Sequence, residues 1–340
     1  MAEAEKEAVP PQRAMMQLMF GKQLTASIAA IARLGIADHM GSDPLPVEAL
    51  AAKSGAHAPS LYRVMRMLAS LGVFRQEGRK FALTPVGELL RTDAPTSLRH
   101  MAMMLGDEWS IKAYAHMADC VRTGGDGITM AYGKQIFEYF AEHPEQAETF
   151  QKAMTNGSVI AAESVLKAYD FSGIERLADV GGGHGLLIAT ILERYPDMRG
   201  VLFDLPEVVA GVPKGRLAEC DGRLEVEAGS FFERVPKGCD AYLMKHIIHD
   251  WSDEHCRTIL KLIRERLPKH GRVLLCELVV GDDPGPTPAK MLDIEMLVIT
   301  VGGKERTRSE FADLFASAGL KLNRVVETPT PTCVIEAVPA

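Results

Sequence analysis

The pattern of hydrophobic and polar positions changes near residue 175. Beyond that point, short apolar runs rich in β-branched residues alternate with segments of helical spacing such as LLIATILERY and EHCRTILKLIRERL. The runs are RLADVG, GVLFDL, RLEVEAG, CDAYLMK and RVLLCELV. This alternation predicts a parallel sheet with helices on both faces. Two further runs, KLNRVVET and TCVIEAV, have only a Pro-containing turn between them and predict an antiparallel hairpin at the end of the sheet.

The first hundred residues have a different pattern, which predicts helices followed by a small β-hairpin. The stretch RAMMQLMFGKQLTASIAAIARLGIADHM is apolar on more than one face, so the expected cover is a second subunit. PVEALAAKSGAHAPSLYRVMRMLASLGV predicts a helix, a Gly-containing turn and a second helix, and FRQEGRKFALT predicts two short strands. Together these segments predict a winged helix-turn-helix. Residues 101 to about 167 predict several further helices.

Composition narrows the class of protein. The chain has 340 residues and a formal net charge of -7, which disfavours nucleic acid as its main partner. No apolar run reaches the ~18 residues of a membrane span, and the acidic start MAEAEKEAVPPQ is not a secretory signal. The six cysteines form no CxxC pair, so we expect reduced thiols in a cytoplasm.

The motif DVGGGHG, at the end of the first predicted strand, indicates a cofactor site. It lacks the GxxxxGK[ST] pattern of a P-loop, and the dinucleotide pattern G-x-G-x-x-G fails because its third glycine position is Leu186. Asp179 beside Gly181 and Gly183 suits a ligand that carries an ammonium and a sulfonium, because glycines allow close backbone approach and a carboxylate stabilises positive charge. S-adenosylmethionine is such a ligand.

Asp204 supports this interpretation. It ends the next strand, in VLFDLP, where the ribose of an adenosyl group would lie and where a carboxylate can accept both ribose hydroxyls. The alternative is that Asp204 caps the helix that starts at Pro206.

Five motifs then identify a family. LADVGGGHG, VLFDLPEVV, AGSFFERVP, MKHIIHDWSDEHC and GGKERT occur in family order and spacing. The sequence resembles the S-adenosylmethionine-dependent O-methyltransferases of the caffeic acid and hydroxyindole type, with bacterial relatives in natural-product pathways. The resemblance covers nearly the whole chain. It implies an α/β fold: a Rossmann-like class I methyltransferase domain, whose mostly parallel seven-stranded sheet ends in an antiparallel hairpin, behind an α-helical winged-helix dimerisation domain.

The resemblance also implies a division of the chain. We expect a flexible tail at 1–12, the dimerisation domain at 13–100, connecting helices that line the acceptor pocket at 101–167, and the S-adenosylmethionine-binding catalytic domain at 168–340. The implied partners are a small hydroxylated aromatic substrate and a second copy of the chain, which pairs through the N-terminal helices.

Residue roles follow from the same resemblance. His249 is the implied general base, and Glu277 and Glu305 match the carboxylates that flank it, fix its tautomer and stabilise its protonated form. Asp250 matches an acidic residue near the acceptor. The cofactor site is expected to include Asp179, Gly181, Gly183, Asp204, Leu205, Ser230, Phe231, Lys245, Trp251 and Ser158.

A base at this position indicates the kind of acceptor. A free imidazole has a pKa of about 6.5 and a phenol of about 10, so the proton transfer costs about 5 kcal/mol. An aliphatic alcohol, near water's ~15.7, would cost about 12 kcal/mol. A carboxylic acid would need no base. A positioned histidine therefore favours a phenolic or enolic hydroxyl, with the remaining work being alignment for in-line displacement.

The motifs give less direct evidence for two parts of the site, the adenine contact and the acceptor pocket. Ser230 stands where the family usually has an aspartate that faces the adenine, although a hydroxyl can still hydrogen-bond the adenine edge. Phe231 is expected to pack on the adenine ring. The candidates for the acceptor pocket are Trp109, Phe150, Met154, Met291 and Met296, and the 17 methionines make a soft pocket plausible.

Three alternatives remain. His246 and His249, with His255 and Cys256, could form a metal site, but no further cluster completes it and the family works without metal; His246 is expected to be structural. A DNA-binding regulator would use Arg63, Arg66, Arg75, Arg79 and Lys80, but the helix SLYRVMRMLASLGV is largely apolar. An N-methyltransferase or a non-methylating S-adenosylmethionine enzyme would keep the fold, but such relatives often lack the histidine.

Overall fold

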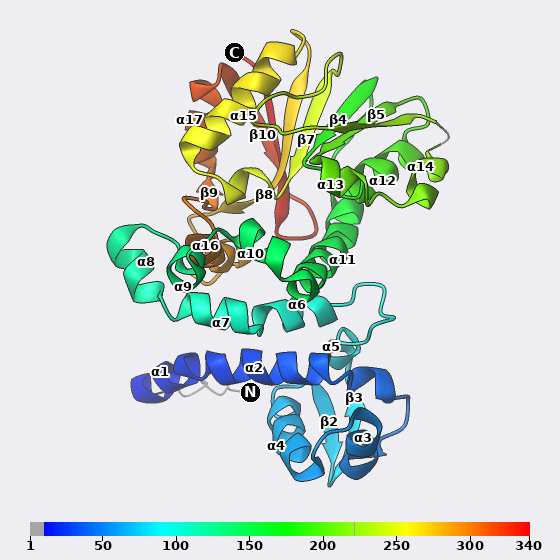
Figure 1. Ribbon diagram of the computed structural model, residues 1–340, viewed down its shortest axis with the longest axis vertical. Coiled ribbons are helices and arrows are strands. Elements are labelled where there is room, and N and C mark those ends of the chain that lie inside the picture. The colour runs from blue at the N-terminus through cyan, green and yellow to red at the C-terminus, as the bar shows by residue number, and fades with distance from the viewer. Residues whose placement is uncertain (1–9, 221) are drawn as a thin grey trace, which may run out of the picture. The chain divides into compact units, whose positions relative to one another are not determined.

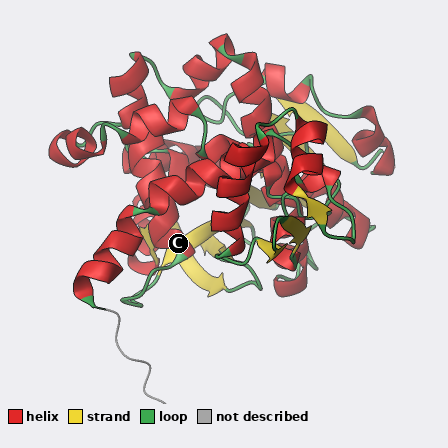
Figure 2. Cartoon of the chain, turned by 90° about the horizontal axis from the view of Figure 1, so that it is seen from below, coloured by secondary structure: helices red, strands yellow, loops and turns green. Residues whose placement is uncertain are grey.

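The computed structural model describes residues 10–220 and 222–340. Contacts between residues divide the chain into two compact units. The first comprises the described residues up to Ile111 together with Pro144–Asn156, and the second comprises Lys112–His143 and Gly157–Ala340. Most of the expected tail at 1–12 lies outside the described residues. The strands of the described residues form two sheets, and the rest of their regular secondary structure is helical (Figure 2).

The first unit begins with helices and contains a three-stranded antiparallel sheet in the order β1-β3-β2 (Figure 1). Its elements are α1 (Pro11–Met19), α2 (Gly21–Arg33), η1 (Ala37–His39), β1 (Leu45–Pro46), α3 (Val47–Ser54), α4 (Ala58–Ala69), β2 (Phe74–Glu77), β3 (Lys80–Leu83), α5 (Pro85–Glu88), α6 (Arg99–Leu105) and most of α7 (Glu108–Tyr114). Gly55, with φ of 70°, ends α3 and makes the turn to α4. The predicted helix-turn-helix with a two-stranded wing is confirmed.

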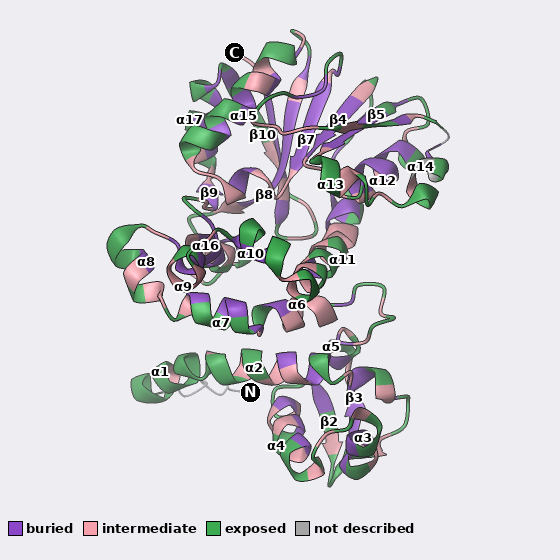
Figure 3. Cartoon of the chain, viewed as in Figure 1, coloured by how far each residue is buried: buried purple, intermediate pink, exposed green. Residues whose placement is uncertain are grey.

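The predicted apolar helix at the N-terminus is present as two helices, separated at Phe20. None of the residues of α1 is buried, and α1 is drawn as exposed along its length (Figure 3). The exposed apolar side chains are Met15, Met16, Leu18, Met19 and Phe20. Exposed apolar side chains that are gathered on one helix are typical of a protein–protein contact.

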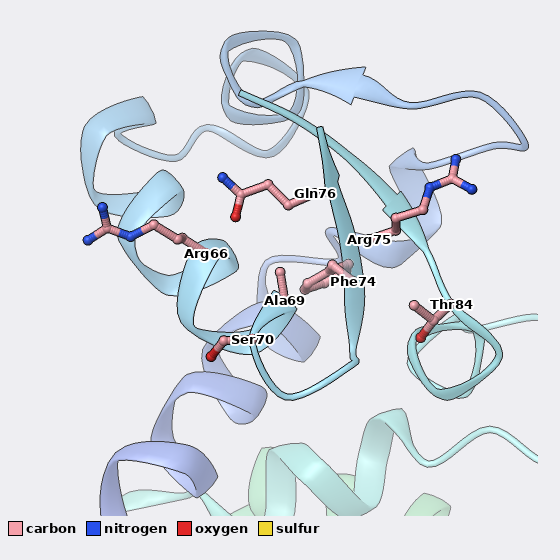
Figure 4. A pocket seen from close by; sticks show the side chains of 7 residues that line it. All are labelled: Arg66, Ala69, Ser70, Phe74, Arg75, Gln76 and Thr84. Atoms are coloured by element: carbon pink, nitrogen blue, oxygen red, sulfur yellow. The ribbon is translucent and has the colours of Figure 1, made fainter. Parts of the chain in front are cut away.

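Two basic residues of the wing, Arg75 and Arg79, are engaged within the first unit. Arg79 donates to Glu48 at 2.9 Å and lies 4.5 Å over the ring of Tyr62, while Arg75 pairs with Glu77 at 3.2 Å. A hollow of about 580 Å³ lies beside them, lined by Arg66, Ala69, Ser70, Phe74, Arg75, Gln76 and Thr84. Figure 4 shows the Arg66 and Arg75 guanidinium groups pointing outward at opposite ends of this hollow, so they do not converge on one ligand position.

The second unit consists of helices followed by alternating strands and helices. Its helices are α8 (Met117–Thr123), α9 (Gly127–Tyr132), α10 (Ile136–Glu142), the later part of α11 (Pro144–Ala168), α12 (Leu186–Arg194), α13 (Pro206–Val209), α14 (Lys214–Glu219), η2 (Ile248–Asp250), α15 (Asp253–Arg266), α16 (Pro288–Ile299) and α17 (Arg308–Ser317). Its strands are β4 (Arg176–Val180), β5 (Arg199–Asp204), β6 (Leu224–Ala228), β7 (Ala241–Lys245), β8 (Arg272–Val280), β9 (Arg306–Thr307), β10 (Leu320–Val326) and β11 (Thr332–Pro339).

Seven of these strands form one sheet in the order β10-β11-β8-β7-β4-β5-β6, and β9 pairs with β8. β8, β7, β4, β5 and β6 are parallel neighbours, whereas β11 is antiparallel to β8 and β10 to β11. The predicted mostly parallel seven-stranded sheet with an antiparallel end hairpin is therefore confirmed.

Successive side chains along each strand point to opposite faces of this sheet, and both faces are buried. Ala178 and Val201 pack with residues of α15 and α17, whereas Leu177 and Leu202 pack with residues of α11 and α12. Both faces are covered by helices, which explains why the strands are nearly continuous apolar runs. Their carboxyl ends meet at one edge, where Asp179, Asp204 and Lys245 lie at the ends of β4, β5 and β7.

Two general features complete the fold. All six cysteines are free thiols. Among the helices that the structure describes, none is both long enough and apolar enough to cross a lipid bilayer.

Candidate active site

The turn after β4 is built from glycines with left-handed backbone conformations. Gly181, Gly183 and Gly185 have φ angles of 73°, 59° and 74°, which residues with a side chain rarely adopt. A Cβ at Gly181 would also lie 2.7 Å from Cδ1 of Ile247, whereas the space next to Gly183 is open. The backbone of this turn can therefore be approached closely at Gly183.

Asp179 lies beneath this turn. Its side chain is buried, and a Cβ at Gly182 would lie 2.7 Å from the carboxyl oxygen Oδ2. Oδ2 has no hydrogen-bond partner among the described residues. Burial raises the pKa of Asp179 to about 7, although the positive charge of Lys245 opposes this shift. A cation bound at the turn would stabilise the ionised form of this carboxyl group.

Asp204 is held by the glycine turn itself. Its Oδ2 accepts a hydrogen bond from the Gly183 N–H at 2.8 Å, and its Oδ1 accepts one from the Leu205 N–H at 2.7 Å. Burial raises the pKa of Asp204, and these two N–H groups lower it. No side-chain hydrogen bond caps α13, whose N-cap residue is Leu205. The capping alternative is therefore not what the structure shows, and Asp204 is oriented toward the turn.

Aromatic side chains lie next to the glycine turn. The Cβ position of Gly181 is 3.5 Å from the Phe231 ring, and the Phe231 and Trp251 rings meet edge to face at 6.1 Å. The hydroxyl of Ser230 accepts a hydrogen bond from the Phe232 N–H at 3.2 Å. Phe231 thus lies beside the turn with Trp251 packed edge to face against it, while the Ser230 hydroxyl binds within its own loop.

His249 lies in η2, immediately after β7, and is buried. Its Nδ1 is 2.7 Å from Oε1 of Glu305, and its Nε2 is 3.5 Å from Oδ1 of Asp250. If Nδ1 donates its proton to Glu305, the neutral ring has its lone pair on Nε2, where a base needs it. Residues 56 apart in the chain therefore fix one orientation of the imidazole.

Glu277 contacts the same loop differently. Its Oε1 accepts the N–H groups of Ile247 at 3.0 Å and Ile248 at 2.9 Å. Its Oε2 lies 3.8 Å from Nδ1 of His249 and has no hydrogen-bond partner among the described residues. Glu305 is therefore the hydrogen-bond partner of the ring, whereas Glu277 holds the backbone and adds negative charge at longer range.

These charges determine the protonation of the site. Burial would lower the pKa of His249, but the carboxylates of Glu277, Asp250 and Glu305 outweigh it and raise the pKa to about 9. Burial raises the pKa of Glu277 to about 7. Burial also lowers the pKa of Lys245, although Asp179 opposes the shift. At neutral pH the isolated site therefore favours a protonated imidazole.

Two functional residues do not appear among the sequence-based candidates. The buried guanidinium of Arg306 donates to the carbonyl oxygens of Ile248 and Trp251, both at 3.0 Å, and so clamps the loop on either side of His249. Asp293 accepts the N–H of Glu305 at 2.9 Å. The GGKERT motif contains Arg306 directly after Glu305, which was the available signal; nothing in the sequence pattern singles out Asp293.

His246 has an unusual backbone for a residue with a side chain. Its φ is 51°, the only positive value at a non-glycine position in the described parts of the chain. Its ring lies 5.2 Å from that of His249, and burial lowers its pKa well below the usual range. A neutral, half-buried ring in this position fits the structural role expected of it.

The metal-ligand alternative from the sequence does not assemble. The Cys256 thiol donates to the carbonyl oxygens of Ile248 and Trp251, and the His255 ring contacts Ser252. Within the described ranges, the group with metal-binding geometry is instead His249, Glu277 and Glu305. The 2.7 Å contact between Nδ1 and Oε1 is a hydrogen bond, shorter than the separation of two ligands that share one zinc ion.

The remaining candidates are distributed over both units. Trp109, Phe150 and Met154 belong to the first unit, and Met291 and Met296 belong to α16 in the second. Trp109 and Met296 are buried, whereas Met291 is 64% exposed. Ser158 lies on α11, and Leu205 is exposed after Asp204. Their roles toward a ligand stay predictions.

Comparisons with known proteins agree over nearly the whole chain. A model described as an O-methyltransferase domain matches residues 114–321, and one described as an O-methyltransferase dimerisation domain matches residues 16–93. The chain is 40% identical over 335 residues to phenazine O-methyltransferase PhzM of Lysobacter antibioticus, which covers 98% of this chain and 97% of the relative.

Two further relatives bear on the chemistry. The chain is similar to CalO1, a methyltransferase in calicheamicin biosynthesis, whose crystal structure is of the SAH-bound form. The two structures superpose with a TM-score of 0.87 and are 33% identical in sequence, over 98% of this chain and 100% of that one. The 8-amino-8-demethylriboflavin N,N-dimethyltransferase of Streptomyces davaonensis is 31% identical over 322 residues, covering 92% of each chain.

Proposed function

The chain belongs to the S-adenosylmethionine-dependent O-methyltransferases with an N-terminal dimerisation domain, and we propose that it methylates a phenolic or enolic hydroxyl of a small aromatic molecule. The observation that carries this proposal is the pairing of His249 with Glu305 beside the glycine turn. A buried imidazole held by a carboxylate is suited to accept a proton from a hydroxyl group.

The residues at the strand ends fit S-adenosylmethionine. Asp179 has a buried oxygen without a partner, Gly183 leaves open space above the turn, and Asp204 is oriented by the same backbone. We assign Gly181, Gly183 and Asp204 to the adenosyl and methionine parts, with Phe231 and Trp251 as the aromatic surface for adenine. When bound, the cofactor supplies a methyl group activated by a sulfonium charge.

His249 then acts as the general base through Nε2. Because the pKa of His249 is about 9 in the free site, the ring must lose a proton before it can accept one from the acceptor. A positive charge nearby disfavours the protonated ring, so occupation of the cofactor site lowers the pKa of His249 toward the working pH. Glu305 keeps the ring oriented and stabilises it once it has taken the acceptor's proton.

We infer that the reaction needs no metal ion. The direct hydrogen bond between His249 and Glu305 supports this, because a metal bound there would have to replace it. Full activity in the presence of a chelator such as EDTA is the expected result. Loss of activity with EDTA that zinc or magnesium restores would overturn this part of the proposal.

A second candidate function is methylation of an amine, which the similarity to an N,N-dimethyltransferase favours. The two are distinguished by their need for a base. A neutral amine can attack the methyl group directly, whereas a phenol must be deprotonated, so only O-methylation requires His249.

Three further inferences concern the setting of the enzyme. The exposed apolar residues of α1 and the match to a dimerisation domain support a homodimer through the N-terminal helices. The internal pairing of Arg75 and Arg79 supports subunit pairing rather than DNA binding as the role of the winged helix. The free thiols support a cytoplasmic location.

The test is incubation with S-adenosylmethionine labelled in its methyl group and a panel of phenols, catechols, hydroxyindoles, flavonoids and aromatic polyketides. The expected product carries the label on oxygen, as read by mass spectrometry and NMR. Label found only on nitrogen would favour the second candidate. Label on no member of the panel, together with no uptake of the cofactor in calorimetry, would contradict the proposal.

A further inference from the structure

A buried carboxyl group outside the catalytic constellation lies on α16. Glu295 is 9% exposed, although its neighbours on the buried side of the helix are apolar: Ala289, Met296, Val298 and Ile299. Burying a carboxyl group among apolar side chains is costly unless its oxygens are hydrogen-bonded. Glutamate is a good helix former, so its presence in α16 is ordinary, whereas its burial is not.

Only one oxygen of Glu295 has a partner. Its Oε2 accepts a very short hydrogen bond from the Tyr114 hydroxyl, a contact between residues 181 apart in the chain. Its Oε1 is inaccessible to solvent and has no hydrogen-bond partner in the described parts of the chain. Leaving a buried acceptor unpaired is unfavourable, and it indicates a partner that the protein does not itself supply.

The surroundings hold this pair in place. Gly127, at the start of α9, packs between the segment of Tyr114 and α16: a Cβ there would overlap the Ala113 carbonyl group and lie 3.1 Å from Cγ1 of Val298. Burial raises the pKa of Glu295, and the bond from Tyr114 lowers it. Tyr114 therefore stabilises the ionised carboxylate without using its second oxygen.

The same helix is attached to the catalytic histidine. Asp293 of α16 accepts the Glu305 N–H at 2.9 Å, and Glu305 in turn bonds the His249 ring. At the end of the helix, a Cβ at Gly303 would overlap both the Thr300 hydroxyl and the His249 carbonyl oxygen.

Resting on the proposed function, we propose that Glu295, positioned by Tyr114, is a specificity-determining residue that binds an N–H or O–H donor on the aromatic acceptor, remote from the hydroxyl that is methylated. Oε1 is closed to solvent in the free protein, so the side chains over it must move apart before it accepts this hydrogen bond from the bound acceptor. A hydrogen bond to a charged group contributes about 1.5–3 kcal/mol, which corresponds to about 10-fold or more in kcat/KM. The preferred acceptors are thus amino- or hydroxy-substituted phenols.

The experiment compares paired phenols that differ by an amino or a methyl group: m-aminophenol with m-cresol, and an aminonaphthol with the corresponding methylnaphthol, substituted on the ring without the hydroxyl. For the wild-type enzyme, we expect kcat/KM for O-methylation to favour the amino member of at least one pair by about 10-fold or more. Glu295→Leu should reduce this ratio to near one. Glu295→Gln, which keeps the volume, should reduce it several-fold.

Controls separate this role from general damage. Glu265→Gln, on the exposed surface of α15, should keep the wild-type ratio, and thermal melting should show that each variant folds. Because the readout is a ratio between two acceptors, a purely structural role of Glu295 would lower both rates and leave the ratio unchanged. The proposal is overturned if the wild-type enzyme discriminates in no pair, or if Glu295→Leu retains the preference.

Failure of the proposed function would look different. It would appear as no methyl transfer to either member of any pair. In that case, calorimetric binding of the same pairs to the protein saturated with S-adenosylhomocysteine decides the question. Tighter binding of the amino member that Glu295→Leu abolishes supports the proposal, and equal binding of the two members overturns it.

Discussion

The two halves of the active site are built in different ways. The cofactor half is made mainly of backbone: left-handed glycines follow β4, and the Gly183 N–H of this turn binds the strand-end carboxylate of Asp204 at 2.8 Å. The base half is made of side chains from distant segments, with His249 from the loop after β7, Glu277 from β8 and Glu305 from the loop before β9. The first half is local in sequence, and the second depends on tertiary structure.

This difference determines what each half tolerates. The glycine turn is sensitive above all to an added Cβ. A buried cluster of one imidazole and several carboxylates depends on charge balance, because removing one member leaves the others unpaired. Mutations in the two halves should therefore separate cofactor affinity from the rate and its pH dependence.

The largest effect is expected from His249→Ala. Loss of the base should lower kcat by about 10² to 10⁴, while the dissociation constant for S-adenosylmethionine changes little, because the glycine turn is untouched. Steady-state kinetics and calorimetry measure the two quantities. His270→Ala, in an exposed turn, is the control. Near-wild-type turnover by His249→Ala would remove this residue from the mechanism.

Gly181→Ala should produce the opposite pattern. The new Cβ would combine a φ of 73° with a 2.7 Å overlap with Ile247, so cofactor affinity should fall by about 10-fold or more as the turn shifts. Gly183→Ala carries the backbone strain without the overlap, since its surroundings are open, and should lose less. Calorimetric titration with S-adenosylmethionine measures the affinity of both variants. Equal losses of affinity would show that backbone strain alone, and not the overlap with Ile247, causes the effect.

Glu305→Gln should change the pH dependence of the base half. In the free enzyme the pKa of His249 is about 9, so kcat/KM should rise with pH as the ring deprotonates and level off above that value. Removing the Glu305 charge disfavours the protonated ring, so the midpoint should move to lower pH.

The rate of Glu305→Gln on its plateau should fall several-fold, because an amide oxygen is a weaker acceptor than a carboxylate and holds the ring less firmly. Glu277→Gln keeps the Glu305 carboxylate and should move the midpoint with a smaller loss on the plateau. A pH–rate profile with an unchanged midpoint in Glu305→Gln would contradict the electrostatic account.

The smallest effect is expected from Ser230→Asp. The family usually has an aspartate at this position, and a carboxylate would accept a stronger hydrogen bond from the adenine amino group than a hydroxyl does. Cofactor affinity should increase by a few-fold without a change in the midpoint of the pH profile. A decrease in cofactor affinity would contradict the contact between residue 230 and the adenine amino group.

The comparison also explains what the sequence could predict. The sheet, its antiparallel hairpin and the winged helix follow from hydrophobic periodicity and turn residues, and the glycine turn follows from one contiguous motif. The break at Phe20 between α1 and α2 was not predicted, because helical propensity continues through it. The carboxylates around His249 were found only through the resemblance to a family.

Other contacts could not be predicted at all. Asp293 and the pair of Tyr114 with Glu295 join residues that are brought together by helix packing, and no local pattern marks them. In the sequence KMLDIEMLVIT, no pattern distinguishes Glu295 from an ordinary helical glutamate. Only its burial and its unpaired oxygen in the structure single it out.

The most direct test of the central claim is NMR titration of the His249 ring in the free enzyme, with S-adenosylmethionine and with S-adenosylhomocysteine. The account predicts a pKa of about 9 in the free enzyme and a lower pKa with S-adenosylmethionine than with its uncharged-sulfur product, because only the former places a sulfonium near the ring. A pKa near the ordinary imidazole value in the free enzyme, or equal values in the two complexes, would contradict it.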